Sequence, residues 1–169
     1  EEAVKLGDHI AIMRDGQIVQ VGSSQDIVLN PCDDYVAEFT QDVRRDTILT
    51  AANVMTAPVT VAFSHLGPQA VLDAIRASGS SMALVVDSSQ KYLGMLTLDL
   101  AAWAVQTGAA RLDEYLDKSA PSVKSDTPLV ELVPLSMVSA LPIPIVDNDG
   151  TLVGEVLRGA LAQSIRQPS

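Results

Sequence analysis

Few side chains in this sequence are of the types that carry out catalysis or hold metal ions. The two histidines, His9 and His65, lie far apart and have no glutamate or cysteine partners at ligand spacing. The single cysteine, Cys32, follows Pro31 without a nearby histidine, which favours a buried or idle thiol over a nucleophile. Since no Ser/His/Asp arrangement or paired-carboxylate site is supported either, the sequence predicts no catalytic or metal centre.

The composition disfavours several classes of partner. Net charge is −10, from 21 acidic and 11 basic residues, and aromatic residues make up only 4%, so nucleic-acid binding is not expected. One cysteine cannot form an intramolecular disulfide, which suits a reducing cytoplasm. No apolar run reaches the ~18 residues of a membrane span, and the start of the chain has no signal-peptide pattern. We interpret the adjacent pair Arg44 and Arg45 as part of a solvated face.

One hairpin pattern occurs twice in the chain. Residues 82–96 and 141–156 share an apolar strand, a turn after an aspartate, and a second apolar strand that crosses a glycine. A single hairpin with one or two helices is too small to bury its own apolar face. The repeat therefore predicts two copies of a small α/β unit that pack sheet to sheet, with two related clefts where ligands commonly bind.

The first copy is expected to run strand, helix, strand, strand, helix. Residues 54–63 form a short extended piece, and residues 67–79 form a helix that opens with Pro68 and ends at Gly79. Residues 82–87 and 92–97 are the hairpin strands, and residues 98–108 are the last helix.

The second copy follows the same plan. Residues 121–124 form the short strand, and Thr127 caps a helix whose first residue is Pro128. Residues 141–157 form the hairpin, and Gly150 gives its turn the positive φ that the turn needs.

Three prolines of the second copy predict local departures from this plan. Pro134 lies inside the helix pattern and should kink or shorten that helix, because it removes one backbone hydrogen bond. Pro142 and Pro144 predict that their strand is an edge strand, because neither residue can donate to a neighbouring strand.

The first 45 residues predict a separate hairpin and helix. Residues 9–13 and 17–22 are apolar strands joined at Asp15-Gly16, and residues 23–30 form a helix that begins with serine caps and stops at Pro31. Because an exposed strand edge invites pairing, we expect this hairpin to pack on the two copies or on a second chain.

Two known families resemble these patterns. "VMTAPVTV", "MALVVDSSQKYLGMLTLDL" and "LPIPIVDNDGTLVGEVLRGAL" resemble a tandem pair of CBS domains, which is a regulatory α/β module of β-α-β-β-α repeats. "GDHIAIMRDGQIVQVGSSQDIVLNPCDDYVAEF" resembles the end of an ABC-transporter ATPase domain. Together they look like the ATP-binding subunit of a glycine betaine/proline (compatible-solute) importer. The resemblance implies three domains. Residues 1–49 form the partial ATPase segment, residues 50–110 form the first CBS domain, and residues 111–169 form the second CBS domain.

The resemblance implies a regulatory fragment rather than an enzyme. The sequence contains no GxxxxGK[ST] loop, no LSGGQ-type signature and no acidic strand end with a catalytic glutamate, so it is not expected to hydrolyse ATP. The resemblance implies that the parent subunit uses ATP and contacts a permease subunit. It also implies a homodimer through the CBS domains, in the cytoplasm and peripheral on the inner face of the plasma membrane.

The resemblance also implies where a ligand would bind. CBS pairs that bind adenosine nucleotides place Thr/Ser and Asp after the second hairpin strand, where they reach phosphate and ribose. Thr97 fits this pattern, and Asp99 comes one residue early, so that capping the next helix or lying on the surface is its alternative role. In the second copy Leu157 and Ala160 replace that polar pair, which leaves Arg158 as a phosphate contact.

The other implied ligand positions are backbone groups beside the buried strands. These positions are Ser81, Met82, Ala83, Ala140, Pro142 and Ile143, with Thr60 and Lys124 on the short first strands. Ordinary strand-edge residues are the alternative interpretation. The expected ligand is an adenine nucleotide or cyclic di-AMP. Ionic strength is the other signal that such a module could sense. The alternative function is a purely structural dimerisation module without a small-molecule ligand. For Trp103, a core or dimer contact is favoured over base stacking.

Overall fold

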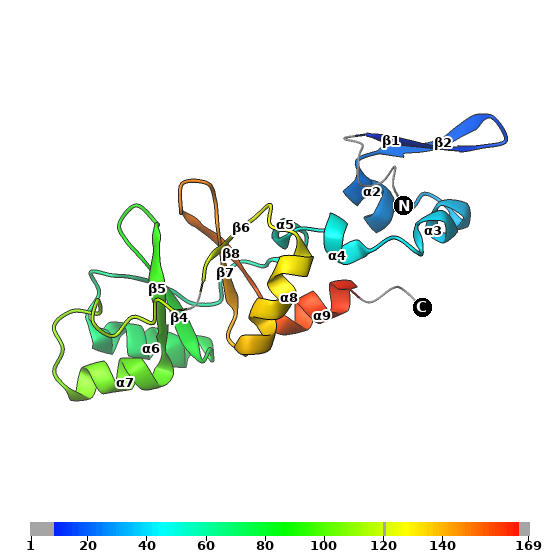
Figure 1. Cartoon of the computed structure of the whole chain (residues 1–169). Helices are drawn as coiled ribbons and strands as arrows, with labels where there is room; N and C mark the ends of the chain where they lie inside the picture. The colour runs from blue at the N-terminus through cyan, green and yellow to red at the C-terminus, as the bar shows by residue number, and fades with distance from the viewer. Residues whose placement is uncertain (1–8, 120, 166–169) are drawn as a thin grey trace.

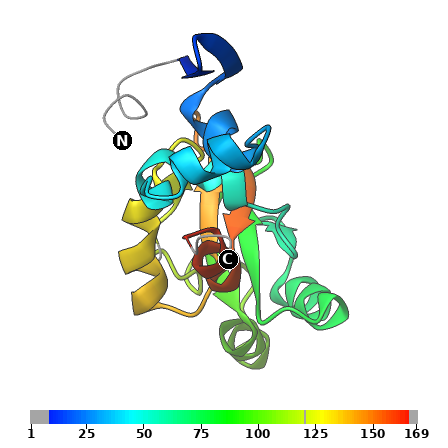
Figure 2. The same ribbon diagram turned by 90° about the vertical axis from the view of Figure 1, so that its right-hand side faces the viewer.

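Figure 1 shows the fold in a computed structural model, which describes residues 9–119 and 121–165. Two α/β modules lie side by side, and an N-terminal hairpin lies away from them, beyond helices α4 (Arg45–Ile48) and α5 (Ala51–Val54). Figure 2 views this row of parts from the hairpin end. Among the described residues, no helix is both long enough and apolar enough to span a lipid bilayer.

The two modules have the same order of elements. Module one consists of β3 (Val61–Phe63), α6 (Pro68–Ser78), β4 (Met82–Val86), β5 (Tyr92–Thr97) and α7 (Leu98–Gln106). Module two consists of β6 (Val123–Lys124), α8 (Leu129–Val138), β7 (Ile143–Val146), β8 (Leu152–Val156) and α9 (Arg158–Ile165). In each sheet the first strand is parallel to the second, and the third is antiparallel to it. The predicted α/β repeat is confirmed.

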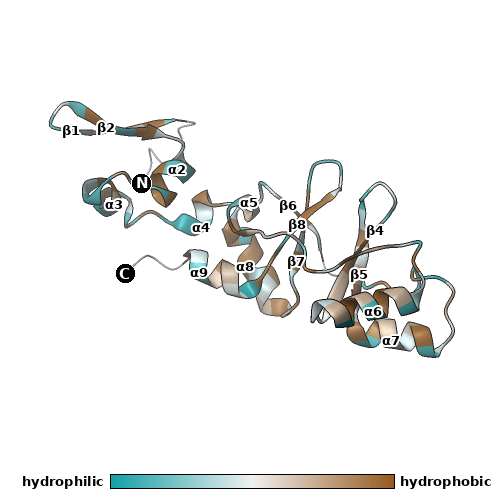
Figure 3. Cartoon of the chain, turned by 180° about the vertical axis from the view of Figure 1, so that it is seen from behind, coloured by the Kyte–Doolittle hydropathy of each residue, from teal (hydrophilic) through white to brown (hydrophobic). Residues whose placement is uncertain are grey.

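The turns of the two hairpins use the same hydrogen bonds. Asp87 Oδ1 accepts from the amides two and four residues later, at 2.8 and 2.9 Å, and Asp147 Oδ1 does so at 2.9 and 2.8 Å. Each turn needs one residue with positive φ, which is Gln90 (φ 63) in module one and Gly150 (φ 81) in module two. Figure 3 shows both turns in teal above largely brown strands, because the turns are polar and the strands are apolar.

The two sheets bury an apolar interface between them. Met82, Leu84 and Met95 of module one are buried there, with Tyr92, Leu141 and Leu152 packed against them. The hairpins also pair with each other, since Tyr92 N donates to Gly150 O and Leu152 N donates to Gln90 O, both at 3.0 Å. The predicted packing of one copy on the other is therefore confirmed.

Each module's core is completed by the segment that precedes the other module. Helix α5 and Leu49 precede module one, yet they pack in the core of module two with Leu129 and Leu132. Leu112 precedes module two, yet it packs in the core of module one. The two modules therefore exchange their leading segments, which ties them together through their cores as well as their interface.

The exchanged segments explain why a glycine recurs in both hairpins. Thr56 bridges to β8, and Asp117 bridges to β5. A Cβ atom on Gly94 would lie 3.0 Å from Asp117 O, and one on Gly154 would lie 3.0 Å from Thr56 O. Only glycine lets the exchanged backbone approach each strand this closely.

The prediction that Pro142 and Pro144 mark an edge strand is wrong, because β7 lies between β6 and β8. In module one, Leu84 N donates to Thr60 O at 2.9 Å, and the parallel pairing begins at Leu84. Pro144 occupies the same position 60 residues later and has no N–H, so the pairing of module two begins one residue later, at Ile145. The sheet tolerates the proline by shortening β6.

Helix α8 differs from its prediction at its start, whereas α6 matches its prediction. Pro128 is the N-cap of α8 and no side chain caps it, so the predicted Thr127 cap is wrong. The helix continues past Pro134 to Val138, and a kink at Pro134 remains a prediction. In α6, Pro68 is the first residue and Gly79 ends the helix with φ 67, as predicted.

The N-terminal part folds as its sequence predicts. Strands β1 (Ile10–Arg14) and β2 (Gln17–Gly22) meet at Asp15-Gly16, whose φ values of 51 and 80 fit a two-residue hairpin turn. Helix α2 (Ser24–Leu29) begins at Ser23, whose side chain accepts from Asp26 N at 3.1 Å. Helix α3 (Asp34–Thr40) follows it.

The hairpin β1–β2 packs on its own helices rather than on the modules. Ile12 of β1, Ile27 of α2 and Val36 of α3 form a small buried cluster. Figure 1 shows the hairpin away from both modules, so the first predicted location is wrong. Packing on a second chain remains a prediction, and it concerns the face on which Ile18 and Val21 are exposed.

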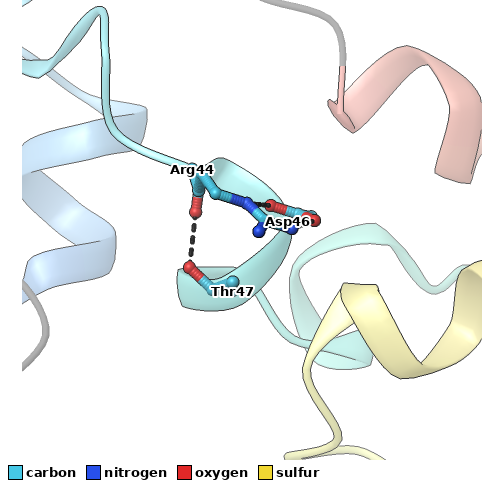
Figure 4. Close-up of polar contacts among 3 residues, drawn as sticks. All are labelled: Arg44, Asp46 and Thr47. Atoms are coloured by element: carbon cyan, nitrogen blue, oxygen red, sulfur yellow. Dashed lines mark hydrogen bonds and ion pairs between the residues drawn. The ribbon is translucent and has the colours of Figure 1, made fainter.

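A short helical turn links the N-terminal part to module two. Arg44 pairs with Asp46 at 2.7 Å, and Thr47 Oγ1 donates to Arg44 O at 2.7 Å (Figure 4). The hydrogen bond from Arg44 holds the pKa of Asp46 below its usual value. Arg45 is half-buried and donates to Val28 O at 2.8 Å, so the interpretation of both arginines as a solvated face is wrong for Arg45. Helix α4 contacts α8 and α9 of module two.

Candidate functional site

A cavity of about 180 Å³ opens at the edge of module two, beside the segment that arrives from module one. Its walls are mainly apolar and come from the end of α8, from the approach to β7, and from Asp117, Ser119 and Pro121. The lining residues are Asp117, Ser119, Pro121, Leu135, Val138, Ser139, Leu141, Pro142, Ile143 and Pro144. Pro142 and Ile143 are therefore the predicted site residues that line this cavity.

Three prolines account for the shape of this edge. Pro121, Pro142 and Pro144 all line the cavity, and none has an amide N–H to pair with a neighbouring strand. Since the pairing of β6 with β7 begins only at Ile145, the backbone before it pairs with β8 but not with the first strand. The cavity lies where this pairing is missing.

The polar end of the cavity is formed by Asp117 and Ser119. Asp117 Oδ1 accepts from Ser119 N at 2.8 Å and from Ser119 Oγ at 2.6 Å. These hydrogen bonds hold the pKa of Asp117 below its usual value, so the carboxylate is charged at neutral pH. The site therefore offers apolar walls for a ring and a carboxylate for a hydrogen-bond donor.

The predicted positions of module one are largely used within the protein. Thr60 is buried, and its Oγ1 lies 2.6 Å from Ser78 Oγ. Ser81 O accepts from Leu98 N at 2.9 Å. Met82 is buried at the interface between the modules, and Ala83 is buried in the core of module one.

Thr97 and Asp99 both lie at the start of helix α7. Thr97 Oγ1 accepts from Leu100 N at 3.3 Å and is the N-cap of α7. Asp99 is exposed in the first turn of α7. The alternative that Asp99 is a surface residue is therefore confirmed, whereas the alternative that it caps the helix is wrong, because Thr97 does so.

The remaining positions of module two lie outside the cavity. Ala140, Lys124 and Arg158 are all exposed, and none of the three is among the lining residues. Lys124 is the last residue of β6, and Arg158 is the first residue of α9. These three side chains do not form part of the cavity wall. A bound ligand would contact them only if it extended beyond the cavity.

Sequence reasoning missed two polar groups that are buried near the module interface. Glu155 is 1% exposed, its Oε1 accepts from Val59 N at 3.3 Å, and burial raises its pKa. The Tyr92 hydroxyl is buried and has no hydrogen-bond partner among the described residues; burial, together with the charge of Asp117, raises its pKa to about 12. The repeat contained a signal for Glu155, because it lies 60 residues after Met95, which faces the same interface.

The other chemically interesting residues lie on the surface. Cys32, His9 and His65 are exposed, so the buried alternative for Cys32 is wrong. Within the described part of the chain, no three His, Cys, Asp or Glu side chains gather as a metal site would require. Trp103 is 55% exposed and meets the edge of Tyr115 at 5.1 Å. Its predicted core role is therefore wrong, whereas a dimer contact remains a prediction.

Comparison with protein families supports the repeat and its N-terminal extension. The profile of the CBS domain matches residues 112–166, which is the second copy. The glycine betaine/carnitine transport ATP-binding protein GbuA of Listeria monocytogenes is 34% identical over 165 residues. That match covers 98% of this chain but 41% of the relative, so the chain spans about two fifths of the relative's length.

Solved structures share the fold of the two modules. Staphylococcus aureus OpuCA superposes with a TM-score of 0.59 at 22% identity, over 66% of this chain and 94% of that structure. CBSX2 in complex with AMP superposes with a TM-score of 0.56 at 19% identity, over 68% of this chain and 94% of that structure. At these identities the likeness concerns the fold, which is that of a CBS-domain pair.

Proposed function

Because this chain carries a tandem pair of CBS domains joined to a segment that matches glycine betaine transport ATP-binding proteins, we propose that it regulates such a transporter. In this proposal the chain is the regulatory region of the ATP-binding subunit of a compatible-solute importer. It senses an adenine nucleotide or dinucleotide and controls uptake. The parent subunit binds ATP and contacts a permease at the inner face of the membrane, whereas this region does not hydrolyse ATP.

The observation that carries the proposal is the cavity of module two. Its apolar walls suit the faces of a flat ring, and the carboxylate of Asp117 suits an amino group at the ring's edge. At about 180 Å³ it is smaller than the roughly 300 Å³ where drug-sized pockets begin. We therefore assign it to a base such as adenine, with the sugar and phosphate outside. The structural relative CBSX2 was solved with AMP.

Asp117 gives a route from this cavity to the other module. Its backbone pairs with Met95 of module one, through Met95 N to Asp117 O at 3.0 Å and Asp117 N to Met95 O at 2.8 Å. A ligand that contacts Asp117 therefore touches the segment that joins the modules. If it binds one arrangement of the pair more tightly than another, it shifts their populations.

Calorimetry and thermal shift with AMP, ATP and cyclic di-AMP test this proposal. We expect at least one of them to bind and to raise the melting temperature, because a ligand that binds only the folded state stabilises it. Asp117→Asn should weaken this binding, and Asp126→Asn, at an exposed site away from the cavity, is the control. Absence of binding at millimolar concentrations of all three would refute adenine sensing and leave ionic strength as the signal.

A second candidate function is a purely structural dimerisation module. Large apolar side chains are exposed on helices of both modules, namely Trp103, Met137 and Val138. The polar pair expected after β8 is replaced by Leu157 and Ala160. Light scattering separates the two candidates: a dimer that Trp103→Ser or Met137→Ser dissociates, with no effect of any nucleotide, favours the structural function.

A further inference from the structure

The two modules differ at the corner that forms the cavity in module two. Three positions of the repeat correspond there, from the first strand, the end of the helix and the central strand. In the order module one to module two, they are Thr60 and Pro121, Ser78 and Ser139, and Leu84 and Pro144. All three residues of module two line the cavity.

In module one, two hydrogen bonds close this corner. Leu84 N donates to Thr60 O at 2.9 Å, which joins the first strand to the central strand. Thr60 Oγ1 and Ser78 Oγ lie 2.6 Å apart, which joins the first strand to helix α6. Ile75 is buried in the core of module one and Leu84 is buried at the interface between the modules, so side chains are buried on both faces of β4 beside this corner.

In module two, neither hydrogen bond can form. Pro144 has no N–H to donate to the first strand, and Pro121 has no side-chain hydroxyl to pair with that of Ser139. Leu135 is only half-buried, and Val138 is 89% exposed. Pro144 therefore cannot join the first strand to β7, and Pro121 cannot join it to the end of α8 as Thr60 does in module one.

We propose that Pro144 and the loss of the hydroxyl pair make module two the single ligand-binding half of this chain. One ligand binds per chain, and module one is closed by its own hydrogen bonds. The class of ligand, a base such as adenine, rests on the proposed function. The location of the site rests on the internal comparison alone.

The experiment maps amide NMR shifts of the whole chain with two probes, AMP and indole. Indole has an apolar ring that fits the cavity without sugar or phosphate, so it tests the cavity independently of nucleotide sensing. We expect shifts at residues 117–121 and 135–145 that saturate at one probe per chain. Residues 60–80 of module one, which lie outside the apolar cluster at the module interface, should not respond.

Two variants test the assigned cause. Pro144→Leu restores the side chain and the N–H that module one has at Leu84, so it should close the corner and weaken binding by about ten-fold or more. The control Ser78→Ala removes a hydroxyl in module one only, and it should leave the affinity within about two-fold. If Pro144→Leu fails to fold, Val138→Trp fills the cavity from its exposed end and should weaken binding equally.

Each outcome decides between the two proposals. Shifts in module two with indole but not with AMP would support the location of the site and refute adenine sensing. Equal shifts in both modules, or more than one probe per chain, would overturn the inference. So would a lack of response to both probes, or unchanged binding in folded Pro144→Leu.

Discussion

At the residue scale, two buried polar groups lie where the modules meet. Burial removes the Glu155 carboxylate from water and so penalises its charged form, and among the described residues the amide of Val59 alone donates a hydrogen bond that partly offsets this penalty. The Tyr92 hydroxyl has lost its contact with water and gained no partner among the described residues. Both groups therefore reduce the stability that this interface contributes.

Glu155 makes stability depend on pH. Its pKa is raised above 4.5 in the folded protein, so the folded state holds the proton more tightly than the unfolded state. The contribution of Glu155 to the stability of the folded protein is fully present below about pH 4.5, where the carboxyl is neutral. This contribution is lost as pH rises through the folded-state pKa. Glu155→Gln keeps an acceptor for Val59 N and should stabilise the protein at pH 7 by roughly 1 kcal/mol.

Chemical denaturation between pH 4 and pH 8 measures this difference. The gain from Glu155→Gln should vanish at the acidic end, where the wild-type carboxyl is neutral in both states. Glu131→Gln, on the exposed side of α8, is the control and should change little. A loss of stability at pH 7 in Glu155→Gln would contradict the assignment.

Tyr92→Phe tests the unpaired hydroxyl. Because it removes a buried polar group without a partner, we expect unchanged stability or a gain of about 1 kcal/mol. The control is Tyr115→Phe, which removes a hydroxyl that lies 2.6 Å from Thr107 Oγ1 and should therefore not stabilise. Thermal unfolding of both variants gives the answer, and a destabilised Tyr92→Phe would mean that the hydroxyl is hydrogen-bonded.

At the element scale, the hairpins depend on glycines that leave room for the exchanged segments. Gly154→Ala would place a Cβ atom 3.0 Å from Thr56 O, which is backbone and cannot move alone. We expect a loss of about 1–3 kcal/mol in the free energy of unfolding, as for other overpacked sites. Gly159→Ala is the matched control, because α9 leaves open space there and alanine favours a helix.

Urea unfolding of the two glycine variants gives this comparison directly. If Gly154→Ala is as stable as Gly159→Ala, the exchanged segment does not pass as close to β8 as described.

The elements that sequence predicted well are those set by local chemistry. Pro68 and Gly79 bound α6, and Asp15-Gly16 turns the first hairpin, because each residue acts on its own backbone. The position of β7 was missed, because whether Pro144 lies at an edge depends on the short strand β6, which is distant in sequence. In the candidate site, Pro142 and Ile143 were identified, whereas Asp117 was not, because only the segment exchange brings it there.

At the scale of the whole molecule, the chain is held together by segments that leave one module and complete the other. Leu49 is 1% exposed in the core of module two, and its carbonyl accepts from Leu129 N at 2.9 Å. The same stretch continues into α4, which joins the N-terminal part to α8 and α9. The N-terminal part and module two therefore contact each other through this stretch.

Leu49→Ala should destabilise module two more than module one. Removing a buried leucine side chain costs about 2–5 kcal/mol, and the neighbours of Leu49 belong to module two. Native-state hydrogen exchange resolves the two modules: amides of β7 and α8 should lose more protection than those of β4 and α6. The reverse order would show that residues 49–54 support module one instead.

The most direct test of the whole account is a crystal structure of the chain grown with AMP. We expect the adenine ring in the cavity of module two, between Pro144 and the carboxylate of Asp117, with one ligand per chain. Well-ordered AMP in module one, or an empty cavity in module two at saturating AMP, would contradict it.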